Sequence, residues 1–464
     1  MLAPSDQSQR LHFTQVAHEL LPPGLLRPPE TLCSLYNLSG IVTPHPKELR
    51  VLFAIQDFAP IYSGAAVRYS RYSAHFRDLG VTTEVFAATP AKGRDPERRL
   101  GSAWEELPLG TLLPTTTVDG TPVTRVRLPE IQGGHRLRWY YRGLRAFLYA
   151  QHPPADIIQA FHASSRAFPG MRQIRRHGKP VILTGTSAPV IPDDRLALLQ
   201  RRLDTLGICH NVDHLVVSST EIRSRWESLG FFKDITVIPN GVDTTVFFSA
   251  GGGASQLPFR RLFNLPDSAF VILFIGKLQP SKGLHYLLAA WPSLAKRIPN
   301  AHLVVVDPGM KSPKSYSSDY GRRIIHMMTE GMVHGPIHRF GFTQEVADII
   351  RSADIFVQPS ETEGMSNVFA EAMASGLPVV TTPFTGLSKA FGVASTHYEL
   401  APFDPEGLGE TIVALAHNRE RRRAMGQSAR RWVEANLSMR MAVKSLQELY
   451  HELKDESSDR GGSR

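Results

Sequence analysis

The sequence predicts an α/β protein built from two doubly wound, Rossmann-like domains that follow one another along the chain. Three observations lead to this fold class: the chain has 464 residues, short apolar segments alternate with helical ones, and the alternation starts again after a break rich in glycine and serine. A chain of this length is too long for one hydrophobic core of ordinary size. Short apolar strands that alternate with helices are typical of a parallel sheet covered on both faces.

The first domain is expected at residues 48–245, after an irregular N-terminal arm at 1–47. Its first run, LRVLFAIQDF at 49–58, indicates a buried strand. A stretch at 90–122 is rich in proline, glycine and threonine, which favours an insertion. Strands are predicted at 49–58, 81–89, 123–128, 156–161, 180–184, 214–219 and 235–238, and helices at 65–79, 137–151, 165–176, 194–206 and 220–229.

The second domain is expected at residues 246–435, with the linker in the segment SAGGGASQ at 249–256. That segment has no apolar pattern around which a core could form. Strands are predicted at 270–276, 302–306, 338–342, 355–359 and 378–382, and helices at 284–297, 319–329, 344–351, 367–375, 405–418 and 419–435. A last helix at 438–453 is a candidate to complete the first domain. The two domains are expected to face each other across a cleft, because ligands of such sheets bind beyond the carboxyl ends of the strands.

The composition is that of a globular protein, with 42% apolar and 20% charged residues. A net charge of +9 makes anionic partners plausible, such as nucleotide phosphates or an acidic membrane surface, although most of the excess is expected on the solvated surface. Cys33 and Cys209 are the two cysteines of the sequence, which excludes a disulfide framework and a cysteine-rich metal site. A reducing compartment fits this usage, so a cytoplasmic location is expected.

The sequence contains no apolar run near the roughly 18–20 residues that span a bilayer, so no membrane crossing is expected. The N-terminal arm lacks a basic start followed by an apolar core, and prolines interrupt its most apolar part. A secretory signal is therefore not expected there.

Two carboxylates mark the most informative segment, ETEGMSNVFAEAMASGLPVVTTPFTG at 361–386, directly after the strand predicted at 355–359. Glu363 is expected in the loop at the carboxyl end of that strand, and Glu371 about one turn inside the next helix. Between them, Gly364–Asn367 lets the backbone approach a ligand, and the helix N-terminus offers unpaired N–H groups. Carboxylates and N–H donors match the hydroxyl groups of a polyol, so the segment predicts a polyol site.

A second motif, GKLQPSKG at 276–283, follows the first strand of the second domain and opens a helix. Lys277 and Lys282 flank a turn at which a diphosphate would meet two ammonium groups and a helix N-terminus. The spacing differs from a Walker A motif, and no G-x-G-x-x-G follows a predicted strand. These departures argue against a kinase, an ATPase and an ordinary dinucleotide oxidoreductase.

From about residue 49 to 453 the chain resembles the retaining GT-B glycosyltransferases of family 4 (glycosyl transferases group 1). The resemblance rests on E-x7-E at Glu363 and Glu371, the run EAMASGLPVV at 371–380, the turn GKLQPSKG, and IPNGVDTTVF at 238–247. It implies a GT-B fold and transfer of a hexose from a UDP-, GDP- or ADP-sugar to an acceptor that the sequence does not identify. Nucleic acid is not an expected partner, since the sequence has no recognition motif for it.

The resemblance also implies roles for individual residues. The catalytic candidates are Glu363, Lys282 and Lys277. The other donor-binding candidates are Gly364, Met365, Ser366, Asn367, Glu371, Phe342 and Thr343. In such enzymes the lysines hold the diphosphate, the carboxylate at Glu371 the ribose hydroxyls, Glu363 with the backbone of 364–367 the sugar, and Phe342 and Thr343 lie near the base.

The first domain matches the family less closely. Ser63–Val67 (SGAAV) resembles its Gly-Gly loop, which approaches the phosphates and the acceptor, with Gly64 kept and Ala65 in place of the second glycine. Thr186 stands where the family usually has a histidine, and His162 is a candidate substitute. The segment VDPGM at 306–310 also departs from a more glycine-rich turn.

The resemblance implies a retaining, front-face reaction in which the leaving phosphate helps to deprotonate the acceptor. The sequence has no pair of acidic residues at a strand end that is spaced to hold a metal ion between them, so a required metal is not expected. Three alternatives stay open: a GT-B phosphorylase or epimerase, a non-catalytic sugar-nucleotide-binding protein and, least supported, a nucleic-acid-binding protein.

A basic, aromatic stretch at 135–151 (HRLRWYYRGLRAFLYAQ) is predicted to be an amphipathic helix. Such a helix could lie on an anionic membrane and present a lipid acceptor. The alternative is that its apolar stripe packs on the sheet of the first domain.

Overall fold

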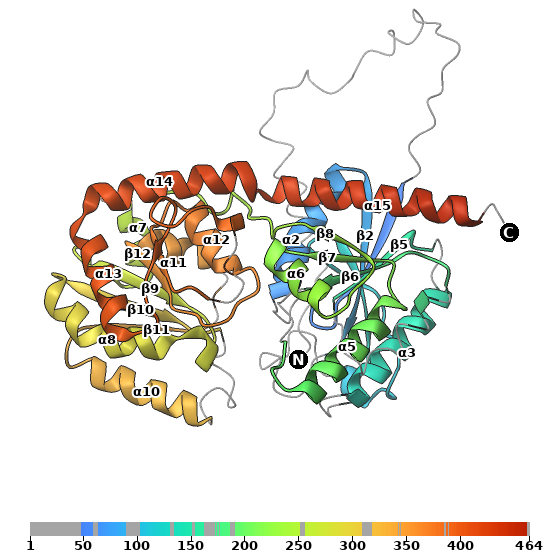
Figure 1. Ribbon diagram of the computed structural model, residues 1–464, viewed down its shortest axis with the longest axis horizontal. Coiled ribbons are helices and arrows are strands. Elements are labelled where there is room, and N and C mark those ends of the chain that lie inside the picture. Colours follow the sequence, from blue (N-terminus) through green and yellow to red (C-terminus); the bar gives the residue numbers. More distant parts are fainter. Residues whose placement is uncertain are drawn as a thin grey trace, which may run out of the picture. The chain divides into compact units, whose positions relative to one another are not determined.

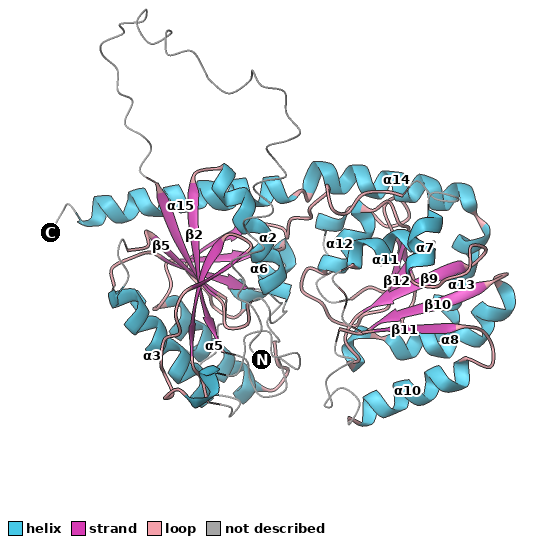
Figure 2. Ribbon diagram, turned by 180° about the vertical axis from the view of Figure 1, so that it is seen from behind, coloured by secondary structure: helices cyan, strands magenta, loops and turns pink. Residues whose placement is uncertain are grey.

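The computed structural model describes residues 48–461 with interruptions, and the described residues form two mainly parallel sheets with helices packed on them (Figures 1 and 2). The residues outside the description are 1–47, 59–63, 90–102, 130–133, 151–153, 162–171, 173, 176, 186–190, 251–255, 309–317, 342, 344, 385–386, 388 and 462–464.

The first sheet has eight strands in the order β3-β4-β2-β1-β5-β6-β7-β8. The strands are β1 (Leu49–Ala54), β2 (Val81–Ala88), β3 (Thr116–Val118), β4 (Thr121–Val126), β5 (Ile157–Ala160), β6 (Val181–Gly185), β7 (His214–Val217) and β8 (Asp234–Val237). The pair β3 and β4 is antiparallel, and the other neighbours are parallel. The helices are α2 (Gly64–Asp78), α3 (Gly134–Ala150), α5 (Arg195–Cys209) and α6 (Thr220–Ser228). The strand order reverses at β1, as in doubly wound sheets.

The second sheet has six parallel strands in the order β11-β10-β9-β12-β13-β14. The strands are β9 (Phe270–Ile275), β10 (Ala301–Val306), β11 (Ile337–Phe340), β12 (Ile355–Gln358), β13 (Val379–Thr381) and β14 (Glu399–Leu400). The helices are α7 (Leu257–Leu262), α8 (Leu284–Arg297), α10 (Asp319–Gly331), α11 (Val346–Ser352), α12 (Asn367–Ala374), α13 (Pro405–His417) and α14 (Arg419–Asn436). The order reverses between β9 and β12, which is where sheets of this kind bind ligands.

The C-terminal helix α15 (Met439–Gly461) packs on the first sheet, although it follows the helices of the second in the chain (Figure 1). Val443, Leu446 and Tyr450 are fully or almost fully buried in the same cluster as Val51 and Phe53 of β1. The aromatic ring of Tyr450 also packs against Phe76 of α2. The first sheet is therefore stabilised by residues from both ends of the described chain.

Most predicted elements are present, and six short ones of the described chain were missed, two of them the 3-10 segments Pro280–Lys282 and Lys389–Phe391. The predicted insertion at 90–122 contains a 3-10 turn, Ala103–Glu106, and the edge strand β3. Helix α7 and the two-residue strand β14 were not predicted. The helix predicted at 165–176 lies mostly outside the described residues, as does the centre of the predicted linker.

The amphipathic helix α3 packs its apolar stripe against the first sheet, as the second interpretation of this segment predicted. Tyr140, Leu144, Phe147 and Leu148 are at most 8% exposed and belong to the core cluster that includes Phe86 of β2. These side chains are consequently not available for insertion into a membrane.

None of the helices in the described part of the chain combines the length and the apolar character that crossing a bilayer requires.

Candidate functional site

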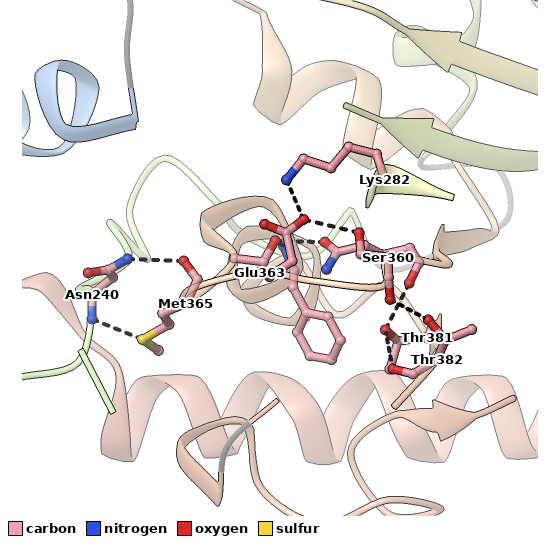
Figure 3. Close-up of polar contacts among 10 residues, drawn as sticks. Asn240, Lys282, Ser360, Glu363, Met365, Thr381 and Thr382 are labelled. Atoms are coloured by element: carbon pink, nitrogen blue, oxygen red, sulfur yellow. Dashed lines mark hydrogen bonds and ion pairs between the residues drawn. The ribbon is translucent and has the colours of Figure 1, made fainter. Parts of the chain in front are cut away.

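The two sequence motifs of the second sheet meet at its carboxyl edge, where the strand order reverses. The turn after β9 contains a short 3-10 segment, Pro280–Lys282, and the loop after the neighbouring strand β12 contains Glu363. The ammonium Nζ of Lys282 lies 2.5 Å from Oε1 of Glu363, and Figure 3 shows the contact. Lys282 is 26% exposed and Glu363 13%, so this ion pair is partly shielded from solvent.

Gly283 allows this close approach. Its φ of +67° lies in the left-handed region, which suits glycine. A Cβ there would lie 1.7 Å from the carbonyl oxygen of Pro359, at the end of β12. The amide of Glu361 also donates to the carbonyl of Ser281 at 2.9 Å. The lysine turn is thus fixed directly against the loop that carries Glu363.

Buried hydroxyl groups hold the loop after β12 in place (Figure 3). Ser360 donates to Oε1 of Glu363 at 3.0 Å. Thr381 and Thr382, at the end of the neighbouring strand β13, donate to the carbonyls of Gln358 and Ser360, each at 2.8 Å. The carboxylate of Glu363 therefore sits on a loop whose backbone is anchored to the next strand.

Ser366 begins helix α12 as its N-cap. Its hydroxyl oxygen accepts from the amide of Phe369 at 3.4 Å, and the hydroxyl donates to Oε1 of Gln358 at 2.6 Å. The positive end of α12 is thereby fixed next to the carboxyl end of β12, a geometry that suits an oxygen-rich or anionic ligand.

Glu371 has a partner from the first sheet's helices. Nη1 of Arg71, on α2, lies 3.0 Å from Oε1 of Glu371, and the guanidinium stacks 5.1 Å from the ring centre of Phe247. Burial raises the pKa of Glu371, while the charge and hydrogen bond of Arg71 act in the opposite direction. The two carboxylates of the E-x7-E motif thus have separate cationic partners.

Asn240 links the segment after β8 to the Gly364–Asn367 loop. Its side-chain amide donates to Oδ1 of Asn367 at 2.8 Å. The same amide donates to the carbonyl of Met365 at 3.2 Å, and the backbone amide of Asn240 lies 3.1 Å from Sδ of Met365 (Figure 3). Asn240, Arg71, Asn367 and Glu371 line the same small recess, together with Arg68 of α2.

The sequence analysis did not assign Arg71 or Asn240 to the site. Asn240 belongs to the quoted run IPNGVDTTVF, so its motif was recognised without a role for the side chain. No local pattern distinguishes Arg71, because its partner lies 300 positions further along the chain.

The remaining predicted site residues are placed as follows. Lys277 is exposed in the turn after β9, and its side chain makes no hydrogen bond or ion pair with Glu363 among the described contacts. Thr343 is half-buried, and its hydroxyl accepts from the amide of Glu345 at 3.0 Å. Gly64 and Ala65 are the first residues of α2, of which only the backbone is described. The other three lie outside the described residues: Phe342, His162 and Thr186.

Within the described part of the chain, no three side chains of histidine, cysteine, aspartate or glutamate gather closely enough to hold a metal ion. The described groups of this site are ammonium and guanidinium groups, carboxylates and a helix N-terminus.

Two family models match the chain: "Glycosyltransferase Family 4" over residues 62–246 and "Glycosyl transferases group 1" over residues 257–432. Among solved structures, sucrose-phosphate synthase from Thermosynechococcus elongatus superposes with a TM-score of 0.70 at 18% identity, over 87% of this chain and 99% of the other. Anabaena HepE in complex with UDP-glucose gives 0.66 at 16% identity, over 87% and 100%. These likenesses, the two sheets and the site define the class: the chain belongs to the family 4 glycosyltransferases of GT-B fold.

Two curated relatives are similar in sequence. The D-inositol 3-phosphate glycosyltransferase of Corynebacterium efficiens is 29% identical over 49% of this chain and 53% of its own length. A GDP-mannose-dependent α-(1-6)-phosphatidylinositol monomannoside mannosyltransferase of Mycobacterium tuberculosis is 24% identical over 83% of this chain and 94% of its own length. The chain spans about half the length of the first curated relatives that it matches, 52–60%.

Proposed function

We propose that this protein transfers a hexosyl group from a nucleotide diphosphate sugar to a hydroxyl acceptor, with retention of the anomeric configuration. The observation that carries the proposal is the Lys282–Glu363 pair at the point where the strand order reverses, beside the N-terminus of α12. A cation and a helix N-terminus suit a diphosphate, and carboxylates suit sugar hydroxyls.

In the proposed reaction, negative charge grows on the departing diphosphate as the sugar–oxygen bond breaks. Lys282 and Lys277 neutralise that charge, and the front-face departure lets a phosphate oxygen take the proton of the attacking hydroxyl. The glycosidic bond to the acceptor forms on the face from which the diphosphate leaves, so the configuration is kept. Glu371 binds the ribose, and Glu363 with the 364–367 loop orients the hexose.

The donor and the acceptor can be identified by mass spectrometry. The named relatives act with GDP-mannose or on inositol-containing acceptors, and HepE was solved with UDP-glucose, so these compounds define the first panel. The panel combines UDP-, GDP- and ADP-sugars with inositol phosphates, phosphatidylinositol and cell extract. Product that contains both donor hexose and acceptor supports transfer. Epimerised donor without acceptor, phosphate-dependent turnover, or tight binding without turnover would contradict it.

We also propose that the reaction needs no metal ion, because lysines neutralise the diphosphate. Activity in excess EDTA should therefore stay within about threefold of the activity of the untreated enzyme, since the proposed mechanism contains no metal ion that EDTA could remove. Steady-state rates before and after chelation test this. A complete loss that Mn²⁺ or Mg²⁺ restores would show that the lysines are not sufficient.

Peripheral contact with a membrane is proposed through helix α5 in place of α3. Its leucines at 196, 199, 203 and 206 share one face and are 77%, 55%, 51% and 40% exposed. Exposed arginines at 195, 201 and 202 accompany them. An exposed apolar helix face with flanking basic residues is typical of an interfacial helix on an anionic bilayer.

Flotation with phosphatidylglycerol vesicles tests this contact. The double substitution Leu196→Ser and Leu199→Ser should reduce the bound fraction at least about fivefold. The contact loses apolar surface, and each Å² of buried apolar surface contributes about 25 cal/mol to binding. The matched control is Met332→Ser with Val333→Ser, which removes two similarly exposed apolar side chains from the turn after α10. Equal losses in both variants, or no binding by the wild type, would favour a soluble acceptor.

A further inference from the structure

A cavity of about 510 Å³ lies at the amino edge of the second sheet, opposite the edge that carries Lys282 and Glu363. Its walls are the starts of β12 and β13, the turn Ser375–Pro378 and one face of α14. Cavities of this size commonly accommodate small organic ligands.

The walls of this cavity are strongly basic. Five arginines and two carboxylates line it: Arg351, Arg419, Arg422, Arg423 and Arg430, with Asp354 and Glu420. The carboxylate of Asp354 already accepts from Arg260 at 2.7 Å. Arg351 and Arg430 form ion pairs with Asp348 and Glu434. Arg419, Arg422 and Arg423 are the cavity arginines without an ion pair in the described chain, so they exceed the one remaining carboxylate, that of Glu420.

Most of this excess lies at the start of α14. Arginines occupy four of its first five positions (Arg419–Arg423, RERRR), at the helix end whose dipole favours acidic groups. Arg421 pairs with Glu399, but Arg419 and Arg423 are exposed and their side chains make no hydrogen bond or ion pair in the described chain. The neighbouring guanidinium groups repel one another, and an anion bound between them would reduce this repulsion.

Arg422 lies between these two and is half-buried. It donates to the carbonyls of Leu415 and Ala416 and stacks 5.0 Å from the ring centre of Phe270. Burial lowers the pKa of Arg422, the charge of Asp354 raises it, and the nearby charge of Arg419 lowers it again. The guanidinium is therefore held in place, close to a second cation.

We propose that this cavity binds the phosphate group of a phosphorylated small molecule. Phosphate oxygens match the fork of a guanidinium, and a dianion would neutralise Arg419 and Arg423 at the positive end of α14. The cavity is separate from the proposed donor site and does not depend on its assignment.

The cavity also touches the helix that carries Glu371. Arg430 donates to the carbonyl of Ala374, the last residue of α12, at 2.6 Å, and the amide of Ser375 donates to the carbonyl of Glu371 at 3.0 Å. A ligand in the cavity therefore contacts the turn that ends α12.

Isothermal titration with inorganic phosphate tests the proposal. Arg419→Gln with Arg423→Gln should raise the Kd at least about tenfold, since charge-assisted hydrogen bonds are lost. The matched control is Arg431→Gln with Arg440→Gln, which removes two exposed arginines of α14 and α15 outside the cavity, and Lys282→Ala tests the donor site. Both should change the Kd less than about twofold, because neither alters a cavity residue.

Three results would overturn the proposal: no binding by the wild-type protein, equal weakening in the two double variants, which indicates diffuse charge, and loss of binding in Lys282→Ala. Both cavity arginines are exposed, and their side chains make no hydrogen bond or ion pair with the described residues, so the variant should fold. Thermal melts monitor this, and Arg423→Glu provides a second variant that should weaken binding further.

Discussion

Replacing Lys282 with alanine should lower kcat by roughly 100- to 1,000-fold, or about 3–4 kcal/mol, while KM changes much less. The reason is that the negative charge on the diphosphate is larger in the transition state than in the bound substrate. A cation aimed at the leaving group stabilises the first state more than the second, and its loss appears in kcat. The variant also leaves Glu363 with Ser360 as its remaining partner, which loosens the loop that orients the hexose.

Two further variants test whether the loss of activity comes from the missing positive charge at position 282 or would follow the removal of any surface lysine. Lys282→Arg keeps the charge and should retain more activity than Lys282→Ala. Lys296→Ala removes an exposed lysine near the end of α8 and should be neutral. The measurement is steady-state kinetics with the identified donor, beside circular dichroism melts. Wild-type kcat/KM in a folded Lys282→Ala protein would remove the main support for this donor site.

The fold was predictable where the pattern is local. Runs such as FVILFIG at 270–276 and IFVQP at 355–359 have no polar alternation, so their burial in a parallel sheet follows from the sequence. The predicted bounds of α8, Leu284–Arg297, match the structure, since Gly283 and the lysine turn mark its start. The edge elements β3 and β14 were missed because two or three residues carry no periodicity, and their strand character depends on the neighbour they pair with.

The site was predictable motif by motif but not as a set of contacts. Placing Lys282 and Glu363 at the carboxyl ends of strands follows from the order strand, turn, helix. Their ion pair depends on β9 and β12 being neighbours, which the sequence order does not reveal. The pairs Arg71–Glu371 and Asn240–Asn367 join segments 300 and 127 residues apart, so only tertiary structure defines them. The assigned roles of these residues stay predictions that kinetics must test.

Glu371→Ala should act on donor affinity, raising KM about 10- to 100-fold, or roughly 1.5–3 kcal/mol, with little change in kcat. Ribose hydroxyls carry the same charge before and during transfer, so a carboxylate that binds them contributes equally to both states. The structure adds a second consequence, because Arg71 loses its anionic partner in this variant.

Arg71→Ala tests that consequence, since it removes the ion-pair partner of the buried carboxylate of Glu371. The double variant Arg71→Ala with Glu371→Ala measures the coupling of the pair. If the two residues are coupled, the double variant should lose less stability than the sum of the two single variants. We expect a difference of about 0.5–1 kcal/mol from the melting temperatures, because Arg71 is partly exposed. The KM of Arg71→Ala then shows what the contact does to donor binding. A lower KM means that Arg71 competes with the ribose for Glu371, whereas a higher one means that it orients the carboxylate. Additive stabilities together with an unchanged KM in both single variants would contradict the assignment of Glu371 to the ribose and the role of Arg71 as its partner.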